Sequence, residues 1–332
     1  MCGFVSLVNC FISLDERKKI FLELKKINSH RGPDKIIDYH KNNLSVLFRR
    51  LKIIDLTEKS NQPFFNENKK IFTIFNGEIY NYIELKKELE NKKIHFQTSS
   101  DTEVIIKLYE MYGIEFVTKL RGMFSILIFD TNLNKTFFFR DRLGQKPLHY
   151  SNYKKGIIFS SEIKDIIYIK NKQRLIENSE TVTEYLLRGW RDKSDRTFFK
   201  DIYQIPPACY GELDGSNLKI KKYWELDCNG RKNFNEDEFI DKYNENLKIH
   251  LRSDVPIAFA LSGGVDSSSL IKNSIKFQRN NIQAYSLLSN YSNDNDERKI
   301  VEKFVKENNI FHEFYNIHDN ISNNILEDII QK

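Results

Sequence analysis

The chain has 332 residues, of which 40% are hydrophobic and 30% are charged. This composition supports packed cores and excludes a mainly disordered polar chain, and the length predicts about two domains. No apolar run approaches the ~18 residues that a membrane helix needs. The apolar stretch near the N-terminus follows no basic segment, so we expect no secretory signal.

The formal net charge is +6, with acidic and basic residues interspersed along the chain. A mildly basic, solvated surface explains this charge, so binding to nucleic acid is not expected. The four cysteines, Cys2, Cys10, Cys209 and Cys228, form no CxxC pair and no pattern typical of a disulfide framework. We therefore expect a cytoplasmic protein that binds neither nucleic acid nor membrane. The oligomeric state stays open, with a homodimer as one option.

The first two thirds of the chain alternate short apolar strands with a few helices. Apolar spacing and β-branched or aromatic runs predict, in chain order, a helix over 15–28 with Asp15 as N-cap, a strand over 71–75, a helix over 103–112, and strands over 123–130 and 136–139. The strands are almost continuously apolar, which predicts sheets covered on both faces.

A zone rich in Gly, Pro and polar residues then separates two patterns, and we predict a first domain over 2–215, a linker over 216–234 and a second domain over 235–332. The second domain alternates helix, strand and loop. The predicted elements are a helix over 235–251, a strand over 256–261, a loop over 262–268, a helix over 269–279, a strand over 282–288, and helices over 296–308 and 325–332. This alternation indicates a doubly wound parallel α/β sheet, with too few strands to complete it.

Cys2 stands directly after the initiator Met1. If Met1 is removed, the Cys2 thiol shares its residue with an α-amine whose pKa lies near ~7.7–8.0. That amine can accept the thiol proton at neutral pH, so nucleophile and base belong to one residue. The ordinary alternative is a cysteine without a catalytic role.

Three other features suit acyl-transfer chemistry. An Arg50 fork can hold a carboxylate, Asn76 with Gly77 can form an oxyanion hole, and Asp101 can accept an ammonium. Each has an ordinary alternative: a surface ion pair for Arg50, a turn for Asn76-Gly77 and a helix N-cap for Asp101.

Taken together, the motifs resemble the class II glutamine amidotransferases, and most closely the glutamine-hydrolysing asparagine synthetases. The matching segments follow the family's order: Met1-Cys2-Gly3, residues 30–34 (HRGPD), the Arg50 segment, residues 76–81 (NGEIYN), the Asp101 segment, residues 140–148 (RDRLGQKPL) and residues 160–164 (SSEIK). The resemblance implies an N-terminal-nucleophile αββα sandwich in four layers. Phe48 and Lys52 depart from the family's usual His and Ser, and both bear on the glutamine pocket.

The resemblance also implies the roles of the site residues. Cys2 attacks the glutamine side-chain amide while Asn76 and Gly77 stabilise the oxyanion, and glutamate and ammonia leave. The residues implied to bind glutamine are Arg50, Ile54, Asn76, Gly77, Glu78 and Asp101.

The second domain carries the loop Ser262-Gly263-Gly264-Val265-Asp266-Ser267-Ser268 between a predicted strand and a helix. Its glycines allow close approach to an anion, and amide groups at a helix start can cradle a pyrophosphate. The loop lacks the Gly-Lys-Ser/Thr of a Walker A motif, and Asp266 can serve a Mg²⁺ ion. A serine-capped turn is the ordinary alternative.

This loop resembles those of enzymes that cleave ATP to AMP and pyrophosphate, and the resemblance implies a PP-loop domain of the ATP pyrophosphatase kind. The residues it implies for ATP are Leu261, Ser262, Gly263, Gly264, Asp266, Ser267, Ser268 and Leu287. Ammonia would displace AMP from an aspartyl-AMP. The family's later Ser-Gly-x-Gly-x-Asp-Glu segment and downstream Lys are not in this sequence, so we expect an incomplete synthetase site. Three alternatives stay open: another carboxylate acceptor, a glutaminase alone, and a binding module without turnover.

Overall fold

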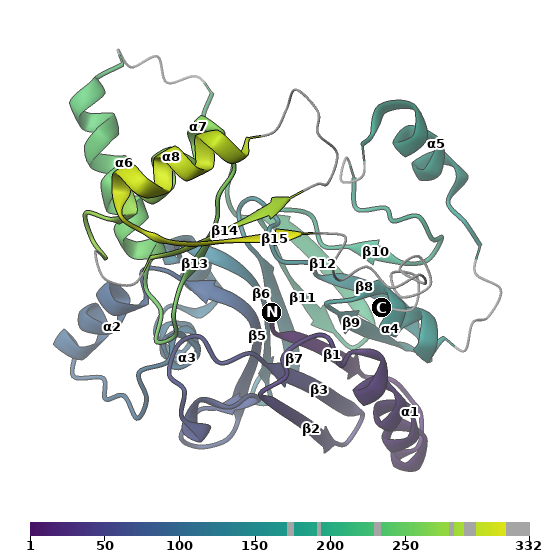
Figure 1. Ribbon diagram of the computed structural model, residues 1–332. Coiled ribbons are helices and arrows are strands. Elements are labelled where there is room, and N and C mark those ends of the chain that lie inside the picture. Colours follow the sequence, from purple (N-terminus) through teal and green to yellow (C-terminus); the bar gives the residue numbers. More distant parts are fainter. Residues whose placement is uncertain (171–175, 191–193, 229–233, 279–281, 289–296, 317–332) are drawn as a thin grey trace. The chain divides into compact units, whose positions relative to one another are not determined.

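The computed structural model describes the chain except for residues 171–175, 191–193, 229–233, 279–281, 289–296 and 317–332 (Figure 1). Contacts divide the chain into two compact units, Met1–Asn229 and Gly230–Lys332, and each is described by itself. No helix among the described residues is long and apolar enough to cross a membrane. The helix predicted over 325–332 lies outside the described residues.

The first unit contains two six-stranded antiparallel sheets. The first has the order β10-β8-β9-β1-β3-β2, with strands Tyr203–Gln204, His149–Tyr153, Gly156–Ser160, Gly3–Val8, Leu44–Arg50 and Lys35–Lys41. The second has the order β12-β11-β7-β6-β5-β4, with strands Asn217–Lys222, Cys209–Asp214, Lys135–Arg140, Gly122–Asp130, Ile71–Ile79 and Phe64–Phe65.

Helices cover the outer face of each sheet. The helices α1 (Leu14–Ile27) and α4 (Ile163–Ile169) pack on the first sheet, and α2 (Tyr82–Asn91) and α3 (Asp101–Tyr112) on the second (Figure 1). Between the sheets lies an apolar layer that includes Phe48, Phe72, Phe138 and Phe159. Each side chain of this size, once buried, contributes about 2–3 kcal/mol. The predicted αββα sandwich and the burial of its sheets on both faces are confirmed.

Smaller elements complete the first unit. They are the helix α5 (Ser179–Arg188) and two 3₁₀ segments, η1 (Glu58–Ser60) and η2 (Gly113–Lys119). The strand β12 falls inside the segment predicted as linker and pairs along its whole length with β11. Its alternation of half-buried Leu218 and Ile220 with exposed lysines is the pattern of an edge strand.

Several predicted boundaries were wrong, for local reasons. Ser13, rather than Asp15, is the N-cap of α1, because its hydroxyl accepts the Glu16 N–H at 3.1 Å. Ser100 likewise caps α3, so Asp101 is the first helical residue and its carboxylate is left for other partners.

The second unit contains a three-stranded parallel sheet in the order β13-β14-β15, with strands Ala258–Ala260, Gln283–Leu288 and Phe311–Asn316. Its helices are α6 (Glu236–His250), α7 (Val265–Ser274) and α8 (Arg298–Asn308). One apolar cluster joins Leu247, Phe259, Ile271 and Val301 from these elements. The parallel α/β arrangement is as predicted. However, α7 begins at Val265 rather than at residue 269, because Gly264 serves as its N-cap and the serines continue into the first turn.

Candidate active site

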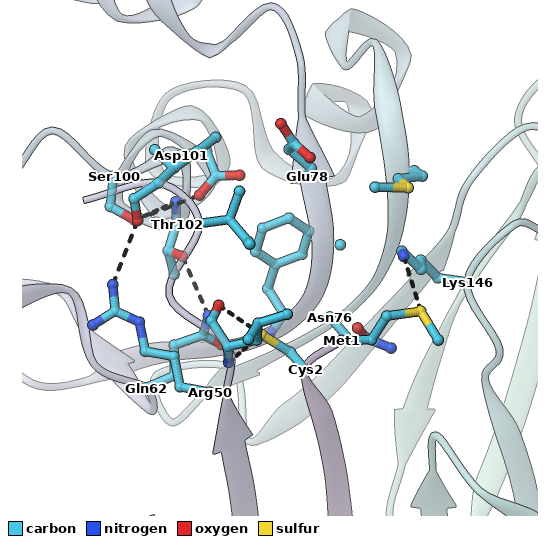
Figure 2. A pocket seen from close by; sticks show the side chains of 16 residues that line it. Met1, Cys2, Arg50, Gln62, Asn76, Glu78, Ser100, Asp101, Thr102 and Lys146 are labelled. Carbon is cyan, nitrogen blue, oxygen red and sulfur yellow. Dashed lines mark hydrogen bonds between the residues drawn. The ribbon is translucent and has the colours of Figure 1, made fainter. Parts of the chain in front are cut away.

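The N-terminus of the first unit opens into a cavity of about 250 Å³ (Figure 2). Its wall brings together residues that are far apart in the sequence. They come from the chain start before β1, the end of β3, the middle of β5 and the first turn of α3: Cys2, Arg50, Asn76, Gly77, Glu78 and Asp101. All the residues predicted for glutamine, including Ile54, line this one cavity.

Cys2 is fixed from two sides. Its sulfur accepts the Leu51 N–H at 3.2 Å, and its carbonyl oxygen accepts from Arg31 Nη1 at 2.9 Å. Burial raises the pKa of the Cys2 thiol and lowers the pKa of the terminal amine, which belongs to Met1 in this chain. A thiol with a raised pKa needs a nearby base to become a nucleophile, and a terminal amine with a lowered pKa is suited to that task.

Asn76 and Gly77 lie inside β5, not beyond its end as predicted. They pair with Ser125 and Phe124 of β6. The Asn76 side chain is 1% exposed, and its Nδ2 is a buried donor with no hydrogen-bond partner in the described structure. A Cβ on residue 77 would lie 2.0 Å from the Met123 carbonyl oxygen, so only glycine fits there. An unpaired donor in the same cavity as the thiol could stabilise an oxyanion.

Arg50 forms the opposite wall and is 4% exposed. Its Nη1 donates to Thr57 O at 2.7 Å and to Asn61 Oδ1 at 2.9 Å, and Nη2 donates to Asp55 O. These contacts hold the guanidinium rigidly against the segment 54–57. A bound carboxylate would therefore meet a cation whose position is already fixed.

Two carboxyl groups face the cavity. Burial, and then repulsion from Asp101, raises the pKa of Glu78 to about 7, while Lys146 opposes the rise. Burial also raises the pKa of Asp101 to about 6, although its Oδ2 accepts the Ile79 N–H at 3.1 Å. Neither carboxyl forms an ion pair among the described residues, so an ammonium ligand could pair with them.

Sequence reasoning assigned no role to Gln62 or Lys146, which also line the cavity. Gln62 accepts the Phe75 N–H at 2.6 Å and donates to Thr102 Oγ1 at 3.3 Å, so it ties β5 to α3. No motif marks Gln62. Lys146 lies in the matched segment 140–148, which was the available signal.

The two departures from the family pattern lie away from the cavity wall. Phe48 is fully buried in the layer between the sheets. The Lys52 ammonium contacts the Glu58 carboxylate at 2.8 Å, and its backbone N–H donates to Asp34. Neither side chain lines the cavity, so the expectation that they alter it is not supported by their positions.

In the second unit the residues 262–268 form a strand–loop–helix junction. The Ser262 and Ser267 hydroxyls are 2.9 Å apart, and the Gly264 N–H donates to Ser262 Oγ at 3.3 Å. The Gly263 N–H donates to the Glu297 carboxylate at 2.9 Å. The Gly263 amide, which could donate a hydrogen bond to a phosphate, therefore already donates one to a carboxylate.

The other residues predicted for ATP lie in different environments. Asp266 and Ser268 belong to the first turn of α7, where Asp266 is exposed. Leu261 is 4% exposed within the apolar cluster, whereas Leu287 is 76% exposed on β14. These two leucine side chains therefore do not share one surface.

No group of three or more His, Cys, Asp or Glu side chains among the described residues is arranged to hold a metal ion. Mg²⁺ bound to nucleotide phosphates needs only one or two protein carboxylates. The exposed Asp266 carboxylate at the start of α7 fits that need, and Mg²⁺ held there would neutralise charge on a pyrophosphate.

Comparison with known proteins agrees with this geometry. A glutamine amidotransferase domain family matches residues 1–224, and an asparagine synthase family matches residues 239–331. Asparagine synthetase [glutamine-hydrolyzing] 2 of Bacillus subtilis is 35% identical over 323 residues, covering 92% of this chain and 43% of the relative. Amidase chry2 of Gibberella zeae is 34% identical over 258 residues, covering 73% and 36%.

Among solved structures, the glutamine phosphoribosylpyrophosphate amidotransferase from B. subtilis complexed with ADP and GMP has a TM-score of 0.44 at 14% identity, covering 98% of this chain and 64% of that chain. The αββα sandwich of the first unit is the fold of the N-terminal-nucleophile class, and its residues match the glutamine amidotransferase domain family. The chain belongs to the glutamine amidotransferase domain family through residues 1–224, and residues 239–331 add the match to the asparagine synthase family. It spans less than half the length of the curated relatives named here.

Proposed function

We propose that the chain hydrolyses glutamine at Cys2 and that the ammonia serves an ATP-dependent amidation. The observation that carries the first half is the buried, unpartnered Nδ2 of Asn76 in the same cavity as the Cys2 thiol. A buried donor without a partner destabilises a native protein by about 1–3 kcal/mol, and a hydrogen bond to a ligand oxyanion would recover that free energy.

The reaction follows from the residues in the cavity. After removal of Met1, the Cys2 amine takes the thiol proton and the sulfur attacks the glutamine amide carbon. Asn76 stabilises the oxyanion that forms. The amine returns the proton to the leaving nitrogen, and ammonia departs as the C–N bond breaks. Water then cleaves the thioester, which releases glutamate and restores the thiol.

The rest of the cavity selects glutamine among amides. Arg50 takes the α-carboxylate, and Glu78 with Asp101 takes the α-ammonium. The raised pKa values of both carboxyls support this assignment, because a cationic ligand would lower them.

The second unit supports ATP as the cosubstrate. Ser262, Gly263, Gly264 and Ser267 would cradle the pyrophosphate, with Mg²⁺ at Asp266. Aspartate is the acceptor that the asparagine synthetase relatives favour, and it would form an aspartyl-AMP that ammonia attacks. The relationship to Amidase chry2 favours a second candidate, the amidation of another carboxylate.

Glutamate release from glutamine tests the first half. The wild-type chain should release glutamate and Cys2→Ala should not, whereas release that survives Cys2→Ala would reject the nucleophile. For the second half, AMP and pyrophosphate are measured with ATP, Mg²⁺ and either aspartate or a panel of other carboxylates. Turnover only with a carboxylate other than aspartate would replace the first candidate by the second.

A further inference from the structure

Lys146 is a buried cation beside the active cysteine. The residue is 7% exposed, and its backbone N–H donates to the Asp141 carboxylate at 3.0 Å. Its ammonium has one hydrogen-bond partner in the described structure, the Met1 sulfur at 3.6 Å (Figure 2). A thioether is a weak acceptor, so this ammonium has no strong hydrogen-bond acceptor among the described residues, and the Glu78 and Asp141 carboxylates act on it without forming an ion pair.

Arg31, the other cation near the chain start, differs in this respect. Its guanidinium forms an ion pair with the Glu162 carboxylate and also donates to the Cys2 carbonyl oxygen. Its charge is therefore largely compensated. The Lys146 ammonium, by contrast, forms no ion pair among the described residues.

The charged groups that face the terminal amine are Cys2, Arg31, Asp34 and Lys146. The groups that face the Lys146 ammonium are Cys2, Arg31, Glu78 and Asp141. Burial and the two cations lower the pKa of the amine, and Asp34 and a Cys2 thiolate raise it. Removal of Met1 takes away the thioether and transfers the terminal amine to Cys2, which lines the same cavity as Lys146.

We propose that Lys146 is a positioning residue for the proposed glutaminase: its ammonium, which forms no ion pair among the described residues, keeps the Cys2 α-amine unprotonated at neutral pH, so that this amine can accept the thiol proton. The inference rests on the proposed function. Two cations held close together in a poorly solvated site repel, and the group that releases its proton first is the weaker base, here the α-amine.

The first test compares the pH dependence of kcat/KM for glutamine hydrolysis in wild type, Lys146→Met and Lys146→Arg. Lys146→Met removes the charge but keeps the chain length, so the acidic limb should move to higher pH. The rate should fall about tenfold at pH 7 and recover by pH 9. Lys146→Arg should keep the wild-type limb. The exposed Lys87 on α2 provides the control, since Lys87→Met makes the same charge change away from the cavity.

Lys146 also lowers the pKa of Glu78, which would alter glutamine binding in the same pH range. A second measurement avoids that contribution: alkylation of Cys2 by iodoacetamide, which is neutral and has no α-amino group for Glu78 to bind. The Lys146→Met shift should appear here too. A shift seen with glutamine alone would assign the effect to Glu78 and overturn the inference.

A third measurement requires no change at Lys146. Competitive acetylation of the N-terminus across pH, read by mass spectrometry in a Cys2→Ser chain that keeps Lys146, reports the pKa of the α-amine. A value at or above the ordinary ~7.7–8.0 would overturn the inference. Failure of the wild type to release glutamate would reject the proposed function, whereas an active wild type with an unchanged Lys146→Met profile would reject the role of Lys146 alone.

Discussion

At the scale of single residues, the cavity is defined by groups left without partners. Asn76 Nδ2 is a donor with no acceptor, and Glu78 and Asp101 are carboxyls without a facing cation strong enough to hold their pKa values low. Among the described buried side-chain atoms without a hydrogen-bond partner, which include Ser6 Oγ and Ser125 Oγ, Asn76 Nδ2 is the one whose residue lines the cavity. Gln62, by contrast, is hydrogen-bonded between β5 and α3. The unsatisfied groups match the parts of glutamine that would satisfy them.

Asn76→Ala should separate activity from stability. Loss of an oxyanion donor should lower kcat/KM about 10²–10³-fold. Because the amide nitrogen has no partner to lose, the free energy of unfolding should hardly change. Asn81→Ala is the matched control: Asn81 bonds Lys119 O and the Arg121 N–H, so its loss should cost about 1–2 kcal/mol and leave kcat/KM near wild type. Equal activity losses in both variants would contradict the assignment.

Glu78 should make both glutamine binding and stability depend on pH. Its pKa in the folded chain is about 7 against 4.5 for the ordinary group, so protonation as the pH falls through 7 should raise KM for glutamine. The free energy of unfolding depends on pH in the opposite direction from glutamine binding. The folded chain holds this proton more tightly, so its contribution is greatest below pH 4.5 and is lost as the pH rises through about 7.

Glu78→Gln should therefore stabilise the chain by about 2 kcal/mol at pH 8, after allowance for solvent screening, and by little at pH 4.5. Urea unfolding at the two pH values measures this. A variant less stable than wild type at pH 8 would show that the Glu78 carboxylate is a favourable contact rather than a strained one.

At the scale of elements, sequence patterns located the elements better than their ends. The sequence predicts that the strand over 71–75 ends before Asn76-Gly77, because that pair is typical of turns. Cross-strand pairing with β6 carries it to Ile79, which places Asn76 and Glu78 on a rigid strand. Ser13 and Ser100, rather than nearby aspartates, are the N-caps of α1 and α3. Both residue types are common N-caps, so residue type alone does not identify the capping residue.

For the candidate site, the sequence likewise predicted which residues come together but not the contacts that hold them in place. Resemblance in motif order placed Cys2, Arg50, Asn76 and Asp101 in one cavity, and the structure brings them together. Nothing in the sequence indicated that the Arg50 donors are already engaged by the carbonyls of its loop. Such contacts depend on tertiary packing, and no local pattern encodes them.

At the loop before α7, we predict that the Glu297 side chain competes with a bound pyrophosphate. The Glu297 carboxylate accepts the Gly263 N–H. It therefore occupies the position that a phosphate would take, and its negative charge would repel that phosphate. Glu297→Ala should therefore tighten binding of free pyrophosphate about fivefold, as measured by calorimetry without Mg²⁺. Glu307→Ala, at the far end of α8, removes an exposed carboxylate and should leave the affinity unchanged. Weaker binding in Glu297→Ala would mean that Glu297 supports the loop instead.

At the scale of the whole molecule, every residue lining the Cys2 cavity belongs to the first unit, whereas the residues 262–268 belong to the second. We therefore predict that glutamine hydrolysis at the first site does not depend on the residues 262–268. The two family matches divide the chain in the same way, at residues 1–224 and 239–331.

Ser267→Ala should separate the two half-reactions. The Ser267 hydroxyl accepts the Ser262 N–H at 3.1 Å and lies against the Ser262 hydroxyl, so its loss should loosen the loop and weaken ATP binding about tenfold. Glutamate release from glutamine without ATP should stay within twofold of wild type. Ser269→Ala, two residues further into α7, tests for a general effect on the helix. A matching loss of glutamate release in Ser267→Ala would contradict the separation.

The central claim is that Cys2 acts as the first residue of the processed chain. Intact-mass analysis combined with trapping by an electrophilic glutamine analogue tests this most directly. We predict a chain that lacks Met1 and carries one adduct, located on the N-terminal Cys2 peptide, with glutamate release lost in proportion. Glutamate release from a chain that retains Met1, or an adduct on Cys10, Cys209 or Cys228 in place of Cys2, would contradict the account.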